Sequence, residues 1–222
     1  MTVLAPREGY RRWAPTYGAE TAITWLEDAL AGELTPPLAG LRLLDAGCGT
    51  GRRMRASGAA VAVGADLSPE MLAASGPGGG LLAADVRALP FPGASFDAVW
   101  CRLAIGHLSD AAAVYAELAR VCRPAGTVLV TDFHADAVAA GHRRTFRDAD
   151  GVVREVEHHV HTAGQQIRAA AAAGLTLAGR RDGRVGPAIR PFYERAGRLA
   201  AYREQEGLAV VLALAFRREG VA

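Results

Sequence analysis

The sequence contains no lysine, because all 25 of its basic residues are arginine. A pyridoxal-phosphate enzyme forms its Schiff base with a lysine, and a Walker A loop places a lysine on the phosphates of a nucleotide. Neither kind of site can be built from this chain. The excess of arginine, alanine and glycine is typical of a GC-rich coding sequence and carries no further functional message.

Cysteines and long apolar runs are also scarce. The three cysteines, Cys48, Cys101 and Cys122, form no CxxC pair and no disulfide framework, which favours a reducing compartment. Residues 1–17 lack the apolar core of a secretion signal, and no stretch reaches the eighteen apolar residues of a membrane span. We therefore expect a cytoplasmic protein without a membrane partner.

The charge is nearly balanced, with a net charge of +2 and no run of five basic residues. This pattern indicates no nucleic-acid partner. Half of the 222 residues are hydrophobic, which is enough to bury the core of one ordinary domain. We therefore expect a single domain over residues 1–222, with a helical cap at residues 1–35.

Short apolar runs alternate with helical patterns through the first 131 residues. The runs predict strands at 41–44, 59–65, 81–84, 96–101 and 127–131. Between and before them, the spacing of apolar residues predicts helices at 16–34, 52–56, 68 onward and 110–121. Such an alternation favours an α/β fold with an open, mostly parallel sheet.

The pattern changes after Asp132. Residues 144–161 alternate as in a β-hairpin with Asp150-Gly151 at its turn, so we expect an insertion at about 134–164 that serves as a lid. A helix is expected at 165–173, where Gly174 ends it, and a final strand at 208–216.

The most informative stretch runs from Asp45 to Gly51, with glycines at 47, 49 and 51 directly after a predicted strand. Glycines let the backbone approach a ligand closely because no Cβ intervenes. The stretch does not fit a GxGxxG dinucleotide loop, since the third glycine position holds Arg52 in one register and Met54 in the other. Asp45 would also repel a pyrophosphate and instead favours a cationic group such as an α-ammonium.

Two further acids end the next two strands. Asp66 is placed to accept hydrogen bonds from both ribose hydroxyls, and Asp85 from an adenine amino group, with Val86 or Leu67 packing on the ring. Each acid taken singly is equally well explained as a helix cap or turn residue. Three acids at three successive strand ends favour a nucleoside ligand, because ligands of open α/β sheets bind along that edge.

These motifs together resemble those of the class I S-adenosylmethionine-dependent methyltransferases, with a specific match over about residues 10–135. The segments that carry the resemblance are Tyr10–Tyr17, Asp45–Gly51, Asp66, Asp85 with Leu89-Pro90-Phe91, Phe96–Trp100, Leu103–Leu108 and Arg120–Gly126. The resemblance implies a three-layer Rossmann-like fold. Its seven-stranded sheet would end in an antiparallel pair, here 175–181 and 208–216.

The same resemblance implies S-adenosylmethionine as cofactor and S-adenosylhomocysteine as product. It places Asp45 and Gly47 near the methionine end of the cofactor, with Cys101 and Arg102 bordering it. Tyr10, Trp13 and Tyr17 are interpreted as a cover over the sulfonium or, equally, as an arm packed on the core. The predicted cofactor residues are Tyr10, Tyr17, Asp45, Gly47, Cys48, Gly49, Asp66, Leu67, Met71, Asp85, Val86, Cys101, Arg102 and Leu103.

Histidines are the candidates for a general base, which is needed only if the acceptor arrives protonated. His107 follows the fourth strand, His134 follows the fifth, and His161 closes the hairpin. Packing or a solvated hairpin face would explain them as well. A metal site made by His159 and His161 with His134 or a carboxylate is an alternative, but no histidine spacing matches a known metal motif, so we predict no metal site.

The sequence therefore predicts a methyltransferase for a small-molecule acceptor, such as a secondary metabolite or a cofactor precursor, acting by in-line transfer as a monomer or homodimer. The acceptor atom stays open. Two alternatives keep the same motifs: a protein of this fold that catalyses a non-methylating step such as cyclisation, and a cofactor-binding protein without turnover.

Overall fold

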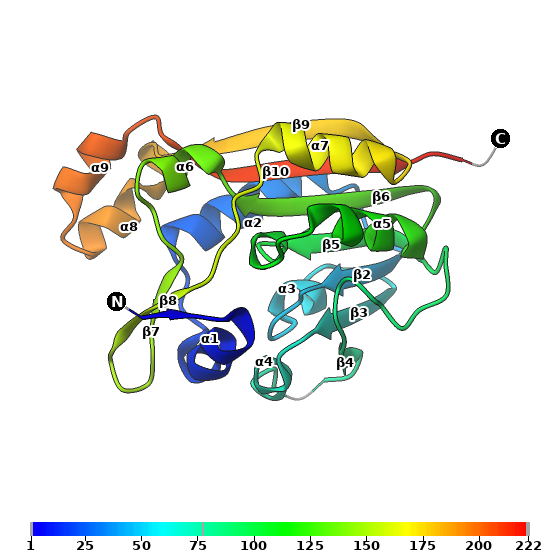
Figure 1. Ribbon diagram of the computed structural model, residues 1–222, viewed down its shortest axis with the longest axis horizontal. Helices are drawn as coiled ribbons and strands as arrows, with labels where there is room; N and C mark the ends of the chain where they lie inside the picture. Colours follow the sequence, from blue (N-terminus) through cyan, green and yellow to red (C-terminus); the bar gives the residue numbers. More distant parts are fainter. Residues whose placement is uncertain (1, 77, 221–222) are drawn as a thin grey trace.

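The computed structural model describes residues 2–76 and 78–220, so residues 1, 77, 221 and 222 of the expected domain lie outside the described residues. Its main sheet has seven strands in the order β4-β3-β2-β5-β6-β10-β9 (Figure 1). The strands are β2 (Arg42–Ala46), β3 (Val61–Asp66), β4 (Leu81–Ala83), β5 (Phe96–Arg102), β6 (Cys122–Phe133), β9 (Leu175–Arg184) and β10 (Ala209–Arg218).

The first five strands in that order run parallel, whereas β10 is antiparallel to both β6 and β9. The predicted fold class, with its antiparallel last pair, is confirmed. Strand β6 is longer than the predicted 127–131, because it already begins at Cys122 and includes Ala125 at a φ of 60°.

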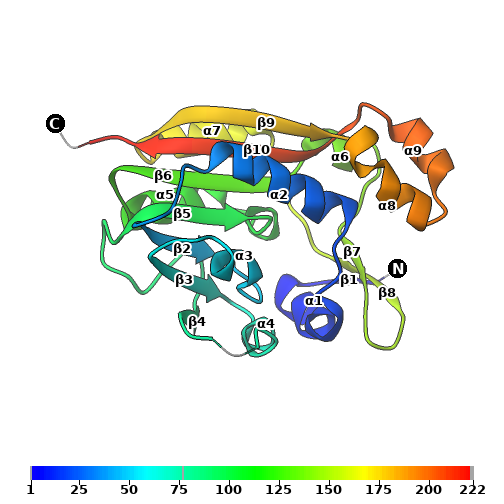
Figure 2. The ribbon, with the colours of Figure 1, turned by 180° about the vertical axis from the view of Figure 1, so that it is seen from behind.

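Helices cover both faces of the sheet. Helix α2 (Ala22–Leu34) packs on β9 and β10, and α3 (Arg52–Arg55) lies on the same side (Figure 2). Helices α5 (Ala111–Val121) and α7 (Ala163–Ala172) pack together on the other face. The shorter helices are α4 (Pro69–Ala73), α6 (Ala135–Ala139), α8 (Arg190–Arg195) and α9 (Leu199–Gln205), with 3-10 turns η1 (Ala14–Thr16), η2 (Ile105–His107) and η3 (Pro187–Ile189).

The N-terminal segment differs from the single predicted helix at 16–34. Thr21 caps α2 by accepting a hydrogen bond from the Thr24 amide at 3.2 Å, so this helix begins only at Ala22. A separate helix, α1 (Pro6–Trp13), precedes it and follows the short strand β1 (Val3–Leu4).

The hairpin after β6 is present but shorter than the alternation of 144–161 suggests. Strands β7 (Thr145–Arg147) and β8 (Val153–Val156) are antiparallel, and Gly151 adopts a φ of 77° in the turn between them. After Val156 the chain returns to the main domain, where the His159 amide donates to the Gly106 carbonyl at 2.7 Å. Strand β1 pairs in parallel with β8, so the N-terminal segment and the insertion form one cover.

The core on the α5 side is built mainly from apolar side chains, with one buried hydrogen-bonded pair among them. Leu44, Val99 and Leu214 are completely buried there, and the buried Tyr115 hydroxyl donates to Gln166 at 2.9 Å. Among the described residues, no helix is long and apolar enough to cross a membrane.

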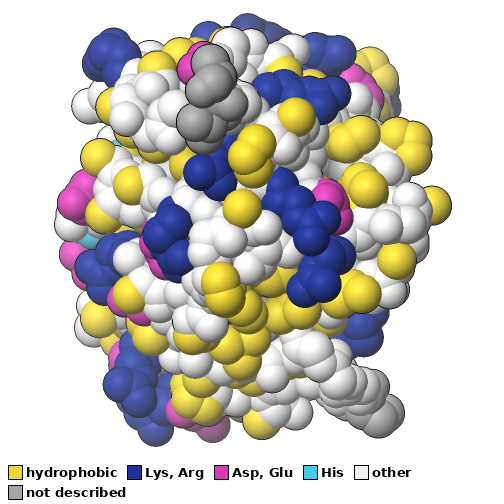
Figure 3. Space-filling view, turned by 90° about the vertical axis from the view of Figure 1, so that its right-hand side faces the viewer, with side chains coloured by type: hydrophobic (Ala, Val, Ile, Leu, Met, Phe, Trp, Pro, Cys, Tyr) yellow, Lys and Arg dark blue, Asp and Glu magenta, His cyan; other side chains and the backbone are white. Residues whose placement is uncertain are grey.

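The end of the molecule at which the parallel strands begin is shown in Figure 3. Arginine side chains lie there in several groups separated by apolar and uncharged side chains. The start of β5 contributes an ion pair, in which Arg123 donates to Asp97 at 2.7 Å. This aspartate therefore lies at the edge opposite the three acids discussed above.

Truncating a buried core leucine will test this packing. Leu214→Ala is expected to lower the free energy of unfolding by about 2–5 kcal/mol, because it removes apolar contacts and leaves a cavity. Leu177→Ala on β9, whose side chain is 40% exposed, is the matched control and should change stability by less than about 1 kcal/mol. Urea denaturation followed by circular dichroism measures both; equal losses would contradict the assigned core.

Candidate functional site

A cavity of about 350 Å³ lies at the carboxyl ends of the parallel strands. Its wall combines strand ends, the first turn of α1 and the segment that follows β8. The lining residues are Ala5, Pro6, Arg7, Tyr10, Tyr17, Gly47, Gly49, Asp66, Leu67, Ser68, Asp85, Val86, Arg87, Arg102, Leu103, Ala104, His107, Leu108, Ser109 and His159.

The glycine loop is fixed against the neighbouring strand. The amides of Gly47 and Cys48 donate to the Ala65 carbonyl at 2.7 and 3.1 Å. Gly47 has a φ of 81°, and a Cβ built on it would lie 2.5 Å from the Cβ of Ala104. Only glycine fits at this position, so the backbone itself forms the cavity wall there.

Asp66 joins this loop to the turn after β3. One carboxylate oxygen accepts from the Gly49 amide at 2.7 Å and the other from the Ser68 amide at 2.8 Å. Burial raises the pKa of Asp66. Each oxygen keeps a further acceptor position, and the residue lines the cavity.

An apolar surface adjoins Asp66. Leu67 lines the cavity although its side chain is 51% exposed, and Val86 lines it from the next loop while nearly buried. Met71 is buried beneath the glycine loop, with its Cε 3.1 Å from where a Cβ of Gly49 would lie. A flat ring lying between Leu67 and Val86 would remove their apolar surface from contact with water.

Asp85 lines the cavity but is held by a residue that the sequence analysis missed. The Arg87 side chain donates to its carboxylate through Nη2 at 2.6 Å and through Nε at 3.0 Å, and the Arg87 amide donates at 2.9 Å. These hydrogen bonds lower the pKa of Asp85.

Asp45 lies below the cavity rather than on its wall. Its side chain is only 1% exposed, and its Oδ2 is buried without a hydrogen-bond partner among the described residues. Burial raises the pKa of Asp45 to about 6, against the opposing charges of Arg102 and Arg53. A buried carboxylate oxygen without a donor is unusual in a folded protein and marks a place for a donor from a ligand.

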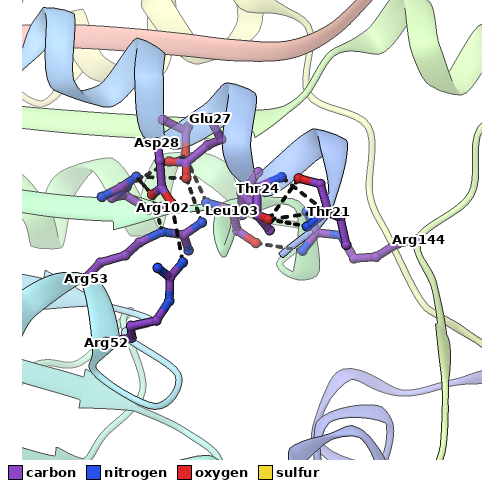
Figure 4. Close-up of polar contacts among 10 residues, drawn as sticks. Thr21, Thr24, Glu27, Asp28, Arg52, Arg53, Arg102, Leu103 and Arg144 are labelled. Carbon is purple, nitrogen blue, oxygen red and sulfur yellow. Dashed lines mark hydrogen bonds and ion pairs between the residues drawn. The ribbon is translucent and has the colours of Figure 1, made fainter. Parts of the chain in front are cut away.

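The two arginines that act on Asp45 belong to an ion-pair network. Figure 4 shows this network, and we call Glu27, Asp28, Arg53 and Arg102 the Glu27 network. Glu27 is completely buried and accepts from Arg102 Nε and Nη2, both at 2.8 Å, while Arg53 Nη2 lies 2.8 Å from it. Asp28 also pairs with both arginines, at 2.5 and 2.8 Å.

The Glu27 network connects four elements. Glu27 and Asp28 come from α2, Arg53 from α3 directly after the glycine loop, and Arg102 from the end of β5. The Thr131 hydroxyl of β6 donates to Glu27 at 2.8 Å and accepts from the Leu103 amide at 3.0 Å. The predicted cofactor residue Arg102 lines the cavity, but two acids hold its guanidinium, and Cys101 is buried in the core instead.

His107 lines the cavity with both ring nitrogens engaged. Nδ1 lies 3.0 Å from the Glu157 carbonyl, so Nδ1 carries the proton and Nε2 accepts. The Tyr10 hydroxyl and Arg144 Nη1 lie 2.8 and 2.5 Å from Nε2. Burial, with the charge of Arg144, lowers the pKa of His107 well below its ordinary value.

The other two candidate bases lie outside the set of residues that line the cavity. His134 caps α6, where its Nδ1 accepts from the Asp136 amide at 3.1 Å and its Nε2 is 3.4 Å from Asp182. His161 donates to the Leu108 carbonyl at 2.7 Å. The structure therefore does not bring the three predicted histidines together, and it places His159 in the cavity instead.

The N-terminal aromatic residues divide between cavity and cover. Tyr10 and Tyr17 line the cavity, whereas Trp13 stacks on Phe146 of the hairpin with ring centroids 4.9 Å apart. Within residues 2–76 and 78–220, no group of three or more His, Cys, Asp or Glu side chains is arranged to hold a metal ion.

Removing Glu27 should destabilise the fold strongly. Glu27→Ala leaves the guanidinium groups of Arg53 and Arg102 with only the partly exposed Asp28 as their shared carboxylate, so we expect the free energy of unfolding to fall by about 3–5 kcal/mol. Glu33→Ala, on the same helix, removes a surface ion pair with Arg181 and should cost less than about 1 kcal/mol. Chemical denaturation of both variants gives the comparison, and a Glu27 variant as stable as the control would contradict this role.

Comparison with known proteins agrees with this architecture. Residues 44–130 match the model of a methyltransferase domain. The chain is 36% identical over 126 residues to a 27-O-demethylrifamycin SV methyltransferase of Amycolatopsis mediterranei, which covers 51% of this chain and 46% of that protein. It is 32% identical over 160 residues to a malonyl-[acyl-carrier protein] O-methyltransferase of Dechloromonas aromatica, covering 70% and 58% of the two chains.

A solved S-adenosylmethionine-dependent methyltransferase from Mesorhizobium loti superimposes with a TM-score of 0.67 at 23% identity, over 91% of this chain and 99% of that one. The chain thus spans about half the length of the curated relatives and nearly the whole of this fold. Residues 44–130 therefore match a methyltransferase domain in sequence, and the chain has the fold of the solved S-adenosylmethionine-dependent methyltransferase.

Proposed function

We propose that this protein is a methyltransferase that binds S-adenosylmethionine in the 350 Å³ cavity and methylates a small-molecule acceptor. The observation that carries the proposal is the joint placement of the Gly47–Gly49 backbone, Asp66 and the apolar pair Leu67 and Val86 on one wall. The two curated relatives act on different acceptors, named as a demethylrifamycin and a malonyl-[acyl-carrier protein], so the family alone does not name the acceptor.

The residues present fit the cofactor. Asp66 has acceptor positions for the ribose hydroxyls, and Leu67 and Val86 offer apolar contact to the adenine. Asp45, with its unpartnered oxygen, would take up the positive charge at the methionine end. The predicted hydrogen bond from the adenine amino group to Asp85 requires the Asp85 carboxylate to accept from Arg87 at the same time. A carboxylate can do so, because each of its oxygens accepts more than one hydrogen bond.

When bound, the cofactor supplies a methyl group on a positively charged sulfur. The protein's own contribution is to hold the acceptor in line with that group and to exclude water. Tyr10 and Tyr17 approach from the N-terminal cover, and their ring faces suit a cation. The cover, fixed to His107 through the Tyr10 hydroxyl, separates the reacting atoms from solvent.

We also infer a cytoplasmic location, from the three widely spaced cysteines, and no nucleic-acid partner, from the small net charge. Both a monomer and a homodimer are compatible with the proposed function.

Cofactor binding is tested by calorimetry with S-adenosylmethionine. Asp66→Ala removes the charged acceptor for the ribose and should weaken binding about ten- to a hundred-fold. Asp97→Ala, an aspartate at the opposite end of the sheet, is the control and should bind as the wild type does.

Gly47→Ala should also weaken binding, because the new Cβ displaces the loop against Ala104. Gly40→Ala, with the same φ of 81° and open space around it, controls for backbone strain. Unchanged affinity in both Asp66→Ala and Gly47→Ala would reject the assigned site.

The affinity should depend on pH through Asp45. Its folded-state pKa of about 6 lies above the ordinary 3.8, so the empty protein holds a proton that a cationic ligand must displace below pH 6. Affinity is therefore expected to fall by up to about tenfold per unit as the pH drops below 6. The same proton stabilises the fold below pH 4, and this stabilisation is lost as the pH rises through 6.

Asp45→Asn should bind the cofactor weakly at neutral pH and lose this part of the pH dependence, with Asp66 accounting for what remains. The measurement is calorimetry between pH 5 and pH 8, in steps of about one pH unit. A pH profile identical in the wild type and in Asp45→Asn would show that another group titrates.

A further inference from the structure

The charged residues around the cavity leave one basic side chain without an acidic partner. Asp85 is paired with Arg87, Arg102 is held by the Glu27 network, and Asp66 accepts two backbone amides. Arg7 is exposed, lines the cavity and makes no ion pair with the described residues. Since Asp66 and Asp45 are assigned to the cofactor under the proposed function, Arg7 is the charge left for the acceptor.

Arg7 lies one helical turn before Tyr10 on α1, and the Tyr10 hydroxyl is 2.8 Å from His107 Nε2. We therefore assign Arg7 to the His107 side of the cavity. The Glu157 amide donates to the Leu4 carbonyl at 2.8 Å, just before α1 begins. Gly9 packs against Val156, since a Cβ on Gly9 would lie 2.8 Å from its Cγ2. The first turn of α1 is therefore fixed to the segment that leads from β8 to His159.

Among the described residues, the ionisable side chains on that side are poorly suited to remove a proton from a neutral acceptor. The His107 Nε2 faces the Tyr10 hydroxyl and the Arg144 guanidinium, and this positive charge opposes protonation of the ring. Burial raises the pKa of Tyr10. The remaining titratable residue on that side is His159, a half-buried ring 3.7 Å from the Glu157 carboxylate.

Arg144 also has a partner behind the cavity wall, where Asp132 Oδ1 lies 3.8 Å from its Nη2 and 3.3 Å from His158 Nε2. This arrangement holds the charge of Arg144 beside His107. An acceptor that is already an anion at neutral pH needs no base, and carboxylic acids, with pKa values of about 4, meet this condition.

We propose that the acceptor is a carboxylate, held by Arg7 on the His107 side of the cavity and methylated on oxygen without a general base. The carboxylate oxygen forms a bond to the methyl carbon while the carbon–sulfur bond breaks, and its electron pair remains on sulfur. The negative charge of the acceptor and the positive charge of the sulfonium cancel. The products are a methyl ester and S-adenosylhomocysteine, and no proton is released.

The experiment uses the full chain with S-adenosylmethionine carrying a labelled methyl group. Malonate, hexanoate and phenylacetate are each compared with the primary amide and the alcohol of the same skeleton. We expect base-labile methyl esters from at least one acid, no labelled product from the amides and alcohols, and a kcat that is flat between about pH 7 and 8.5, where carboxylates are fully ionised.

Arg7→Gln should raise the KM for the acid about tenfold or more with little change in kcat, and Arg7→Lys should restore part of the loss. Arg11→Gln, whose guanidinium pairs with Glu8 on the outer face of the same helix, is the matched control and should behave as the wild type. Binding of the acids to the protein loaded with S-adenosylhomocysteine, measured by calorimetry, should show the same order among the variants.

Methyl transfer to the alcohols or amides, no saturable binding of any of the acids, or an unchanged KM in Arg7→Gln would each overturn the carboxylate proposal. A loss of kcat and of a pH inflection in His159→Gln would do so too, since it would reveal a general base. Failure of the proposed function is a separate result, namely no binding of S-adenosylmethionine by the wild type.

Discussion

The whole site depends on the buried charge pairing around Glu27. This side chain belongs to a helix outside the sheet, yet its carboxylate holds arginines from the helix after the glycine loop and from the end of β5. A carboxylate in that position without the arginines would be costly, and so would the arginines without it. The pairing therefore fixes α2, the glycine loop and the end of β5 in one relative arrangement, directly next to Asp45.

Much of the fold follows from local patterns in the sequence. Short apolar runs that end in aspartate predict β2, β3 and β4, and the Asp45–Gly51 loop predicts where a ligand approaches the backbone. The Asp150-Gly151 turn correctly locates the hairpin between β7 and β8. These features are recognisable because each depends on a few neighbouring residues, such as a glycine with a positive φ or an apolar strand followed by a turn.

The features that the sequence analysis missed depend on residues far apart in the chain. Nothing in the neighbourhood of Glu27 indicates that Arg53 and Arg102 meet it, because 26 and 75 positions separate them from it in the printed sequence. The pairing of β1 with β8 is equally remote, and His134 is a helix cap rather than a cavity residue only because α6 begins directly after it. The one local indication of the Glu27 network in the sequence is an acidic residue on the inner side of an amphipathic helix.

The two-residue strand β1 has a consequence for how ligands enter and leave. It anchors the first turn of α1 to β8 with few backbone hydrogen bonds. The rest of that attachment includes the Tyr10 contact, the packing of Gly9 on Val156, a hydrogen bond from the Thr16 hydroxyl to the Arg147 carbonyl at 2.9 Å, and aromatic stacking. Segments held by so few bonds open at a small fraction of the global unfolding free energy. The spent cofactor would then leave when the N-terminal segment alone detaches, without a change in the sheet or in the ion pairs of the Glu27 network.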